Sequence, residues 1–310
     1  MILCCGEALI DMIPAPTISG PDGFVPHAGG AIFNTAIALG RLGSEVGMFT
    51  GLSSDLFGAQ LRAGLKASTV DTSLIVTSDL PTTLAFVRLV DGQASYTFYD
   101  ENSAGRSLTA QDLPDLPDSI NALYFGGISL CSEPGADAYL ALAQQTGADR
   151  VIMLDPNIRP GFISDEARYR ARLQRMIALA GIVKVSGEDL DWIYADGRCE
   201  VEKAERLRAA GPTVVILTQG SEGAVALTNG AAPIRIAAQK ATVVDTVAAG
   251  DTFNGGFLAR LDQLDVLSRA GIAEIDSATL EDAMGYAAKA AAVTVSRSGA
   301  NPPWAAEMQD

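Results

Sequence analysis

Histidine, paired cysteines and clustered positive charge are scarce in this chain of 310 residues. His27 is the only histidine and none of the four cysteines forms a Cys-x-x-Cys pair, so a zinc site is poorly supplied. Asp and Glu outnumber Lys and Arg by 37 to 22, which gives a formal net charge of -15. That charge repels nucleic acid, which is therefore not expected as a partner. It still allows a nucleotide, because helix N-termini and a small basic pocket bind phosphates locally.

Long apolar runs and a secretory leader are missing as well. Residues 1–14 lack a basic start, and Glu7 and Asp11 interrupt their apolar run, so they indicate a strand rather than a signal peptide. No apolar stretch reaches the roughly 18 residues of a membrane span. Unpaired cysteines are typical of a reducing compartment. We therefore expect a cytoplasmic protein without membrane contact.

Two common nucleotide-binding motifs are absent. The chain contains no G-x-x-x-x-G-K-[ST] sequence, which excludes a P-loop. No G-x-G-x-x-G sequence follows a predicted strand, so the dinucleotide fingerprint is missing too. A dehydrogenase is consequently a poor interpretation of the chain.

The sequence does contain a regular alternation of short apolar runs and amphipathic helical patterns. Continuous apolar strands between helices are typical of a parallel sheet that is covered on both faces. We therefore predict an α/β protein, a three-layer α/β/α sandwich forming a single domain over residues 1–310. The predicted strands cover residues 2–5, 45–50, 122–125, 151–155, 182–185 and 213–218.

One segment departs from this alternation. Residues 83–90 and 95–99 are two strand-like runs on either side of Asp91-Gly92, a strong hairpin signal. Together with a Pro- and Gly-rich stretch near the N-terminus, they predict a small β-sheet lid of approximately residues 11–28 and 83–106. Tyr96 and Phe98 share one face of the second run. If that face is the outer one, it is a candidate surface for a homodimer.

Residues 243–257 are the most informative stretch for chemistry. A β-branched run leads into small residues and then into Phe253 and Phe257 at helical spacing, which predicts a strand, a tight loop and a helix. Small residues let the backbone approach a ligand, and the loop amides with the helix N-terminus form an anion site. Asp251 falls in the first helical turn. A carboxylate beside an anion site suits phosphoryl transfer to a hydroxyl group, although Asp251 could equally be a plain helix N-cap.

A second stretch has the character of a ligand-binding helix start. Gly29 and Gly30 open a helix whose first turn holds Asn34. Two glycines at a helix mouth admit a ligand, and an asparagine side chain offers both a donor and an acceptor to a sugar hydroxyl. A flexible loop with an ordinary capping asparagine explains the same residues equally well.

These two stretches together resemble a known family. Residues 245–251, Asp-Thr-Val-Ala-Ala-Gly-Asp, are similar to the Asp-Thr-x-Gly-Ala-Gly-Asp signature of the ribokinase (PfkB) sugar kinases, and residues 29–34 resemble its N-terminal signature. The resemblance runs from Gly6 to Pro303. Shorter segments that look like bacterial fructokinases occur in the right order at residues 6–11, 154–160, 218–223 and 299–303.

The resemblance implies a role for individual residues. Asp251 would be the base that deprotonates the sugar, and the amides of Ala248, Ala249 and Gly250 would form the anion hole. The sugar would contact Asp11, Gly29, Gly30 and Asn34, with Arg159 near the sugar or the transferred phosphate. The nucleotide would lie along Thr218, Gly220, Gly223 and Asn254.

The resemblance also bears on ions. The family's Asn-x-x-Glu motif, tied to magnesium and phosphate binding, is replaced here by Ser186 to Asp189, where Asp189, or Glu188 instead, would organise the waters of Mg²⁺. Many relatives use a potassium ion. Here its ligands would be the backbone carbonyls of Asp245, Val247 and Gly299.

The function that the resemblance implies is transfer of the ATP γ-phosphate to a sugar hydroxyl, with Mg²⁺ and a possible K⁺. Fructose is the first substrate expected. The alternatives are 2-keto-3-deoxygluconate, then ribose or a nucleoside, and last a sugar- or nucleotide-binding protein without catalysis.

Overall fold

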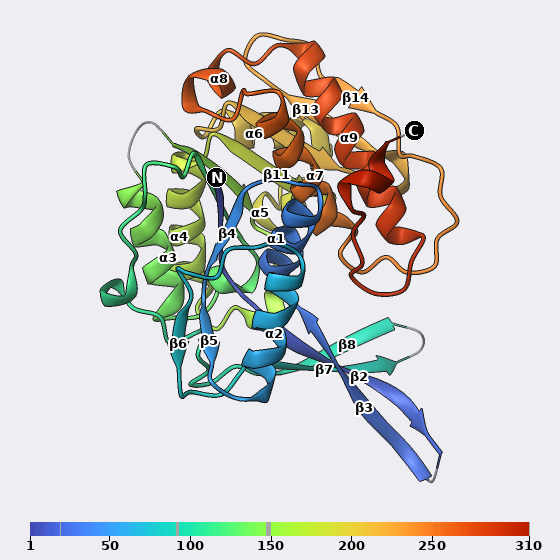
Figure 1. Cartoon of the computed structure of the whole chain (residues 1–310). Coiled ribbons are helices and arrows are strands. Elements are labelled where there is room, and N and C mark those ends of the chain that lie inside the picture. Colours follow the sequence, from blue (N-terminus) through green and yellow to red (C-terminus); the bar gives the residue numbers. More distant parts are fainter. Residues whose placement is uncertain (19, 91–92, 147–149, 310) are drawn as a thin grey trace.

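The computed structural model describes residues 1–18, 20–90, 93–146 and 150–309 (Figure 1). Its centre is an eight-stranded sheet in the order β14-β13-β12-β11-β10-β9-β1-β4. The six strands from β12 to β4 in this order are parallel, whereas β13 and β14 are antiparallel additions at one edge. The strands are β1 (Ile2–Cys5), β4 (Val46–Phe49), β9 (Ala122–Gly126), β10 (Val151–Asp155), β11 (Ile182–Ser186), β12 (Val214–Thr218), β13 (Ala224–Leu227) and β14 (Ile234–Ile236).

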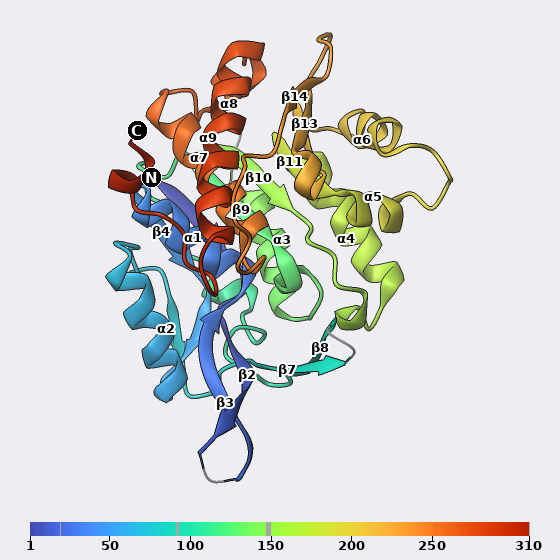
Figure 2. The same cartoon turned by 90° about the vertical axis from the view of Figure 1, so that its right-hand side faces the viewer.

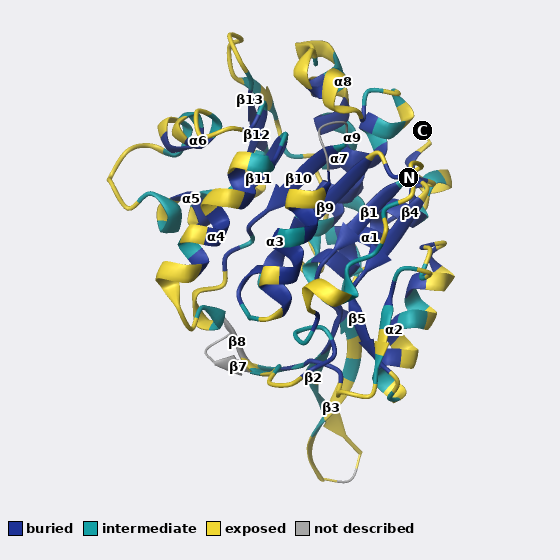
Figure 3. Ribbon diagram, turned by 90° about the vertical axis from the view of Figure 1, so that its left-hand side faces the viewer, coloured by how far each residue is buried: buried dark blue, intermediate teal, exposed yellow. Residues whose placement is uncertain are grey.

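Alternating side chains of the central strands enter two separate hydrophobic cores. In β1, Ile2 and Cys4 join the core on one face of the sheet, and Leu3 and Cys5 join the core on the other. All four are fully buried, as the continuous apolar run predicts for a strand covered on both sides. Figure 3 shows the central strands as buried along their length.

Helices cover both faces of this sheet, as Figures 1 and 2 show. The three-layer α/β/α sandwich predicted from the sequence is therefore confirmed. The layer on the first core contains α1 (Ala31–Arg41), α7 (Ala249–Gln263) and α9 (Ser277–Val295), with α2 (Leu56–Ala67) and the short α8 (Arg269–Ala273) beside them. The opposite layer contains α3 (Gly135–Gln145), α4 (Glu166–Leu179), α5 (Gly187–Ile193) and α6 (Glu200–Arg208).

A second sheet projects from the sandwich (Figure 2). Its strand order is β3-β2-β7-β8, and it is built from β2 (Leu9–Thr17), β3 (Gly20–Gly29), β7 (Leu84–Val90) and β8 (Gln93–Tyr99). These are the two segments from which the sequence predicts a lid. The distal part of the β2–β3 ribbon is exposed (Figure 3). The Asp91-Gly92 turn lies outside the described residues.

Four short strands were not predicted from the sequence. These are β13 and β14, and the two-stranded sheet of β5 (Gly51–Ser53) and β6 (Val76–Ser78). They have three or four residues each, so they show too little alternation to be read as strands. Within the described residues, no helix combines the length and apolar character needed to cross a membrane.

Candidate active site

A cleft of about 650 Å³ opens at the carboxyl ends of the parallel strands. In open α/β sheets, ligands bind at this edge because the loops after the strands converge there. The strands contribute Asp155 from the end of β10 and Lys184 from β11, and the second sheet contributes Leu9, Asp11 and Phe98. The N-terminus of α7 closes the cleft with residues 246–251.

The loop before α7 has the form that an anion site needs. Ala248 precedes the helix in a left-handed conformation with φ 60°, and α7 begins at the next residue. The first amides of α7 have no partner within the helix. They follow this turn directly and lie at the N-terminal end of the helix, where Gly250 and Asp251 also lie. The partial positive charge of a helix N-terminus adds to the attraction for an anion.

The Asp251 carboxylate is held in place by α1. Asn34 Nδ2 donates to Asp251 Oδ2 over 2.9 Å, and Thr35 Oγ1 donates to the Asp251 carbonyl oxygen over 3.1 Å. The pKa of Asp251 is raised from 3.8 to about 7, chiefly by burial, with the Asn34 hydrogen bond and Lys184 opposing the shift and the nearby Asp155 carboxylate adding to it. A carboxylate with this pKa can take up a proton near neutral pH.

A buried polar network lies beneath Asp251. Asp155 Oδ2 accepts from Lys184 Nζ over 3.1 Å and from Asn254 Nδ2 over 2.7 Å. Asn254 also donates to the Tyr124 hydroxyl over 2.8 Å. Lys184 is a residue that the sequence interpretation missed. Its signal was present, because a lysine inside an apolar buried strand needs an anionic partner.

Glu7 is a second residue that was missed. It follows β1, and its carboxylate accepts from the Ala31 amide over 3.1 Å and from the Ser129 amide over 3.2 Å. Burial raises the pKa of Glu7, while the amide donors oppose the shift. Gly30 precedes α1 with φ 107°, and a Cβ there would lie 2.9 Å from the Glu7 carbonyl oxygen. Glycine is therefore required at this turn, and Glu7 fixes the start of the helix that carries Asn34.

Several of the residues expected at the sugar end line the cleft. Asp11, on β2, has its pKa raised to about 6 by burial. Gly29 lies directly against the Asp11 carboxylate, since a Cβ at Gly29 would overlap Asp11 Oδ2. Arg159 lines the cleft from the loop after β10, is exposed, and donates to the Ile158 carbonyl oxygen over 3.0 Å.

The orientation of Phe98 differs from the one expected for an outer lid face. Phe98 lines the cleft, and its ring lies 3.9 Å, centroid to centroid, from the ring of Phe162 in the loop after β10. The pleat puts Asp11 and Phe98 on the same face of the second sheet because both lie in register with Ala85. The Tyr96 side chain lies outside what the structure describes. Phe98, which the sequence analysis names as a candidate for an outer dimer surface, therefore lies on the face of the second sheet that lines the cleft.

The residues expected along the nucleotide lie farther from the cleft than those expected at the sugar. Thr218, Gly220 and Gly223 lie at the end of β12 and in the turn after it, and none of them lines the cleft. The left-handed φ values of the two glycines, 57° and 104°, explain why glycine occupies those positions. Asn254 is corrected: it is 0% exposed and bonded to Asp155 and Tyr124, so its side chain supports the site from below.

The stretch from Ser186 to Asp189 does not fit a direct magnesium site. Asp189 Oδ2 accepts from both the amide and the hydroxyl of Ser186, and Oδ1 accepts from the Ile158 amide over 2.8 Å. Both carboxylate oxygens therefore serve to cap α5 and to hold the loop after β10. In the part of the chain that the structure describes, no three His, Cys, Asp or Glu residues are grouped to hold a metal ion.

The residues expected to bind potassium do come together. Asp245 Oδ1 accepts from the Val247 amide over 3.0 Å, and Asp245 Oδ2 accepts from the Gly299 amide over 2.9 Å. One carboxylate therefore fixes the loop before α7 to the turn after α9. The Gly299 carbonyl, one of the three expected potassium ligands, accepts from the Asn301 amide over 2.9 Å.

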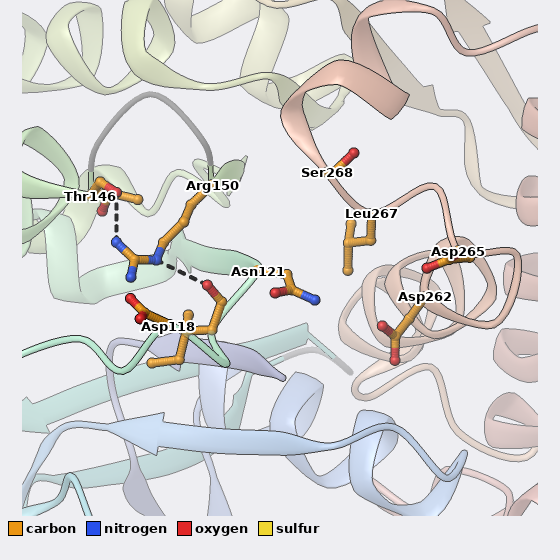
Figure 4. Close-up of a pocket in the computed structure, with 9 residues that line it drawn as sticks. Asp118, Asn121, Thr146, Arg150, Asp262, Asp265, Leu267 and Ser268 are labelled. Atoms are coloured by element: carbon orange, nitrogen blue, oxygen red, sulfur yellow. Dashed lines mark hydrogen bonds between the residues drawn. The ribbon is translucent and has the colours of Figure 1, made fainter.

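Another cavity, of about 430 Å³, lies at the opposite edge of the sheet (Figure 4). Asn121 and Arg150, which precede β9 and β10, mark it as the amino end of the strands. The Arg150 guanidinium donates to carbonyl oxygens of the surrounding backbone, among them those of Ile120 and Thr146. None of the residues predicted for the site lines this cavity, so the chemistry is assigned to the cleft at Asp251.

The fold and the cleft together place a buried carboxylate, that of Asp251, in the first turn of a helix at the carboxyl ends of a parallel sheet. Over residues 1–307 the sequence matches the pfkB family carbohydrate kinases, and the chain belongs to that family. It is therefore a carbohydrate kinase.

Similar proteins agree with this assignment. A fructokinase of Rhizobium leguminosarum bv. trifolii is 50% identical over 282 residues, covering 91% of this chain and 86% of the relative. The crystal structure of a Xylella fastidiosa fructokinase with bound ATP has a TM-score of 0.90 at 28% identity, covering 99% and 96% of the two chains. A Vibrio cholerae O395 fructokinase bound to fructose, ADP and calcium ion has a TM-score of 0.82 at 26% identity, covering 96% and 94%.

Proposed function

We propose that this chain is a fructokinase that transfers the γ-phosphate of ATP to a fructose hydroxyl. The observation that carries the proposal is the position of Asp251, which is fixed by Asn34 in the first turn of α7 and faces the cleft. The similar proteins support ATP as donor, because one related kinase was crystallised with ATP and another with fructose, ADP and a metal ion.

The proposed mechanism is a direct transfer between the two substrates. Asp251 takes the proton of the sugar hydroxyl, and that oxygen forms a bond to the γ-phosphorus. The bond from the γ-phosphorus to the bridging oxygen breaks, and ADP leaves with the electron pair. The amides of Ala248 and Gly250, at the N-terminus of α7, stabilise the negative charge on the transferred group, whereas the Ala249 amide donates to the Thr246 carbonyl oxygen over 3.3 Å. Magnesium would enter with ATP as part of the substrate, since phosphates and water can supply most of its ligands.

The lid excludes water from this reaction. The Phe98–Phe162 contact joins the second sheet to the loop that carries Arg159 across the cleft. Without such exclusion, water would compete with the sugar for the phosphoryl group. At the sugar end, Asp11 and Asn34 would bind hydroxyl groups, with Gly29 and Gly30 giving the ligand room to approach the backbone.

Three further parts of the proposal concern the ion, the assembly and the location. Potassium would bind at the carbonyls of Asp245, Val247 and Gly299, and would stabilise the loop before α7. A homodimer would form through the outer lid face, where Phe24 and Tyr99 are exposed on either side of Phe86, rather than through Phe98. A cytoplasmic location, where ATP is abundant, stays a prediction.

The test is ADP release with magnesium-ATP over a panel of fructose, 2-keto-3-deoxygluconate, ribose, glucose and adenosine, with and without potassium. We expect turnover on fructose and a loss of about 10² to 10⁴ in turnover for Asp251→Asn. Turnover on another sugar alone would replace fructose as the substrate. Ligand binding without ADP formation on any acceptor would instead support a binding protein.

A further inference from the structure

Lys184 has an unusual position for a lysine. It lies in β11 between Val183 and Val185, which are fully buried, and is itself only 6% exposed. Among the described residues it forms an ion pair with Asp155 alone, at 3.1 Å between Nζ and Oδ2. Burial of an ammonium group is costly unless the group is paired and hydrogen-bonded, so the environment of this side chain needs an explanation.

The hydrogen bonds of Lys184 are incomplete. An ammonium group has three N–H donors, and Asp155 accepts one of them. The other two have no acceptor among the residues that the structure describes. Lys184 also lines the cleft together with Asp251. Two free donors of a nearly buried cation therefore face the space in which the substrates meet.

The location of the ammonium group matches the anion site at α7. A Cβ placed on Gly250 would lie 3.4 Å from Lys184 Nζ, so the group lies immediately beside the first turn of the helix. The helix amides and the ammonium group thus approach one small volume from two sides. Although burial alone lowers the pKa of Lys184, the carboxylates of Asp155, Asp189 and Asp251 outweigh it and raise the pKa, so the cation is retained.

The charges around the cleft give this cation a specific use. The described lining residues include the carboxylates of Glu7, Asp11, Asp155 and Asp251, against the cations Arg159 and Lys184. Arg159 is exposed, so Lys184 is the one buried cation among those lining residues. An ATP phosphate that enters near Asp251 is repelled by these carboxylates and needs a positive charge at short range.

We propose that Lys184 is a catalytic residue that donates its two free N–H groups to oxygens of the transferred phosphoryl group, with Asp155 as its positioning residue. The inference rests on the proposed kinase function of the cleft. In the transfer step the proton of the hydroxyl goes to Asp251, and the electron pair of the broken phosphorus–oxygen bond goes to ADP. Lys184 keeps its protons and stabilises the charge on the equatorial oxygens.

The test compares Lys184→Met with the wild type and with Lys203→Met. Lys203 is a matched control because it is also buried, at 4% exposure, and is paired with Asp191 over 2.6 Å on the far layer. Turnover is measured with magnesium-ATP and the sugar, and the affinities for ATP and ADP are measured by calorimetry without sugar. Thermal melting checks that each variant is folded.

We expect Lys184→Met to lower turnover by about 10² to 10³, as does the loss of one donor to a developing negative charge. Its affinity for ATP should fall roughly tenfold more than its affinity for ADP, because only ATP has the γ-phosphate. Lys203→Met should change neither quantity. Equal losses for ATP and ADP, or turnover within threefold of the wild type in a folded variant, would overturn the proposal.

A second variant covers the case in which Lys184→Met does not fold. Lys184→Met combined with Asp155→Asn removes both buried charges, so no carboxylate is left unpaired. The same selective loss of ATP affinity is expected. The nucleotide measurements do not depend on the sugar. If the wild type phosphorylates no sugar but the Lys184 variants lose ATP affinity selectively, only the proposed substrate is contradicted. If the wild type is active and the variants show no such loss, only the role of Lys184 is contradicted.

Discussion

Asn34 Nδ2 lies 2.9 Å from Asp251 Oδ2, and this hydrogen bond joins the first turn of α1 to the first turn of α7. The two residues are 217 positions apart in the chain. Each had been singled out on separate grounds, Asn34 as a sugar ligand and Asp251 as a base. The bond gives Asn34 a second role, because an N–H donor to a carboxylate stabilises its charged form.

The first prediction concerns the pH dependence of Asn34→Ala. Loss of the donor should raise the pKa of Asp251 above its value of about 7. The base is active when deprotonated, so the acid limb of kcat/KM should move to higher pH, by roughly one unit for a lost hydrogen bond to a charged group. The profile is measured from pH 5 to 9. Thr35→Val is the control, because Thr35 bonds the Asp251 backbone and not its carboxylate, and its acid limb should stay in place.

The second prediction concerns the stability of Asp251→Asn. Folding raises the pKa of Asp251 from 3.8 to about 7, so the folded state favours the protonated carboxyl group. Burying the ionised carboxylate lowers the stability of the folded state. This cost is absent below pH 4, grows as the pH rises toward 7, and is complete above that value. Asp251→Asn should therefore raise Tm by roughly 2 °C or more at pH 8.5, and the gain should shrink at pH 5.

Asp55 provides a comparison of opposite sign. Burial tends to raise its pKa, but hydrogen bonds from the Gly58 amide and from Thr82 outweigh burial and lower the pKa. Its stabilising effect is therefore present above the ordinary pKa and is lost as the pH falls. Asp55→Asn should lower Tm at pH 8.5. A gain for Asp251→Asn that was independent of pH would refute the assigned cause.

The third prediction concerns Gly29→Ala. The new methyl group would overlap Asp11 Oδ2, so the carboxylate has to move away from its position in the cleft. We expect the KM for the sugar to rise by roughly tenfold while kcat changes less, as for a loss of ground-state binding. Gly285→Ala in α9 is the control, because apart from its chain neighbours and the backbone of its own helix no described atom lies within 4 Å of the added methyl group. It should leave the KM unchanged and increase stability by about 0.5–1 kcal/mol.

The fourth prediction concerns the aromatic contact across the cleft. Phe98→Ala and Phe162→Ala each remove the ring pair, which contributes about 0.5–1.5 kcal/mol. Each should raise the KM for the sugar several-fold and increase ATP hydrolysis in the absence of sugar. The double variant should be little worse than either single one. Tyr99→Ala is the control, since Tyr99 packs against Phe86 on the outer face, and additive effects of the two cleft variants would count against the contact.

The strands of the parallel sheet could be predicted from the sequence because continuous apolar runs are unambiguous when both faces are buried. The expected bounds of 2–5 and 151–155 match β1 and β10. The bounds of β9, β11 and β12 differ by one residue at one end, and those of β4 by one residue at each end. The position of Asp251 was also predictable, since small residues before a helical pattern specify a loop and a helix start. Strands β7 and β8 could be predicted from the Asp91-Gly92 turn signal, whereas the face on which Phe98 lies could not.

The sequence by itself determined the layers, the loop before α7 and the place of Asp251 in the first turn of that helix, because these depend on local periodicity and on residues that are adjacent in the chain. Only the tertiary structure decided which distant groups meet. It paired Lys184 with Asp155, buried Asn254 beneath the cleft, used both oxygens of Asp189 for capping and aimed Phe98 inward. Such contacts depend on strand register and helix packing over separations of tens of residues, and no local pattern encodes them.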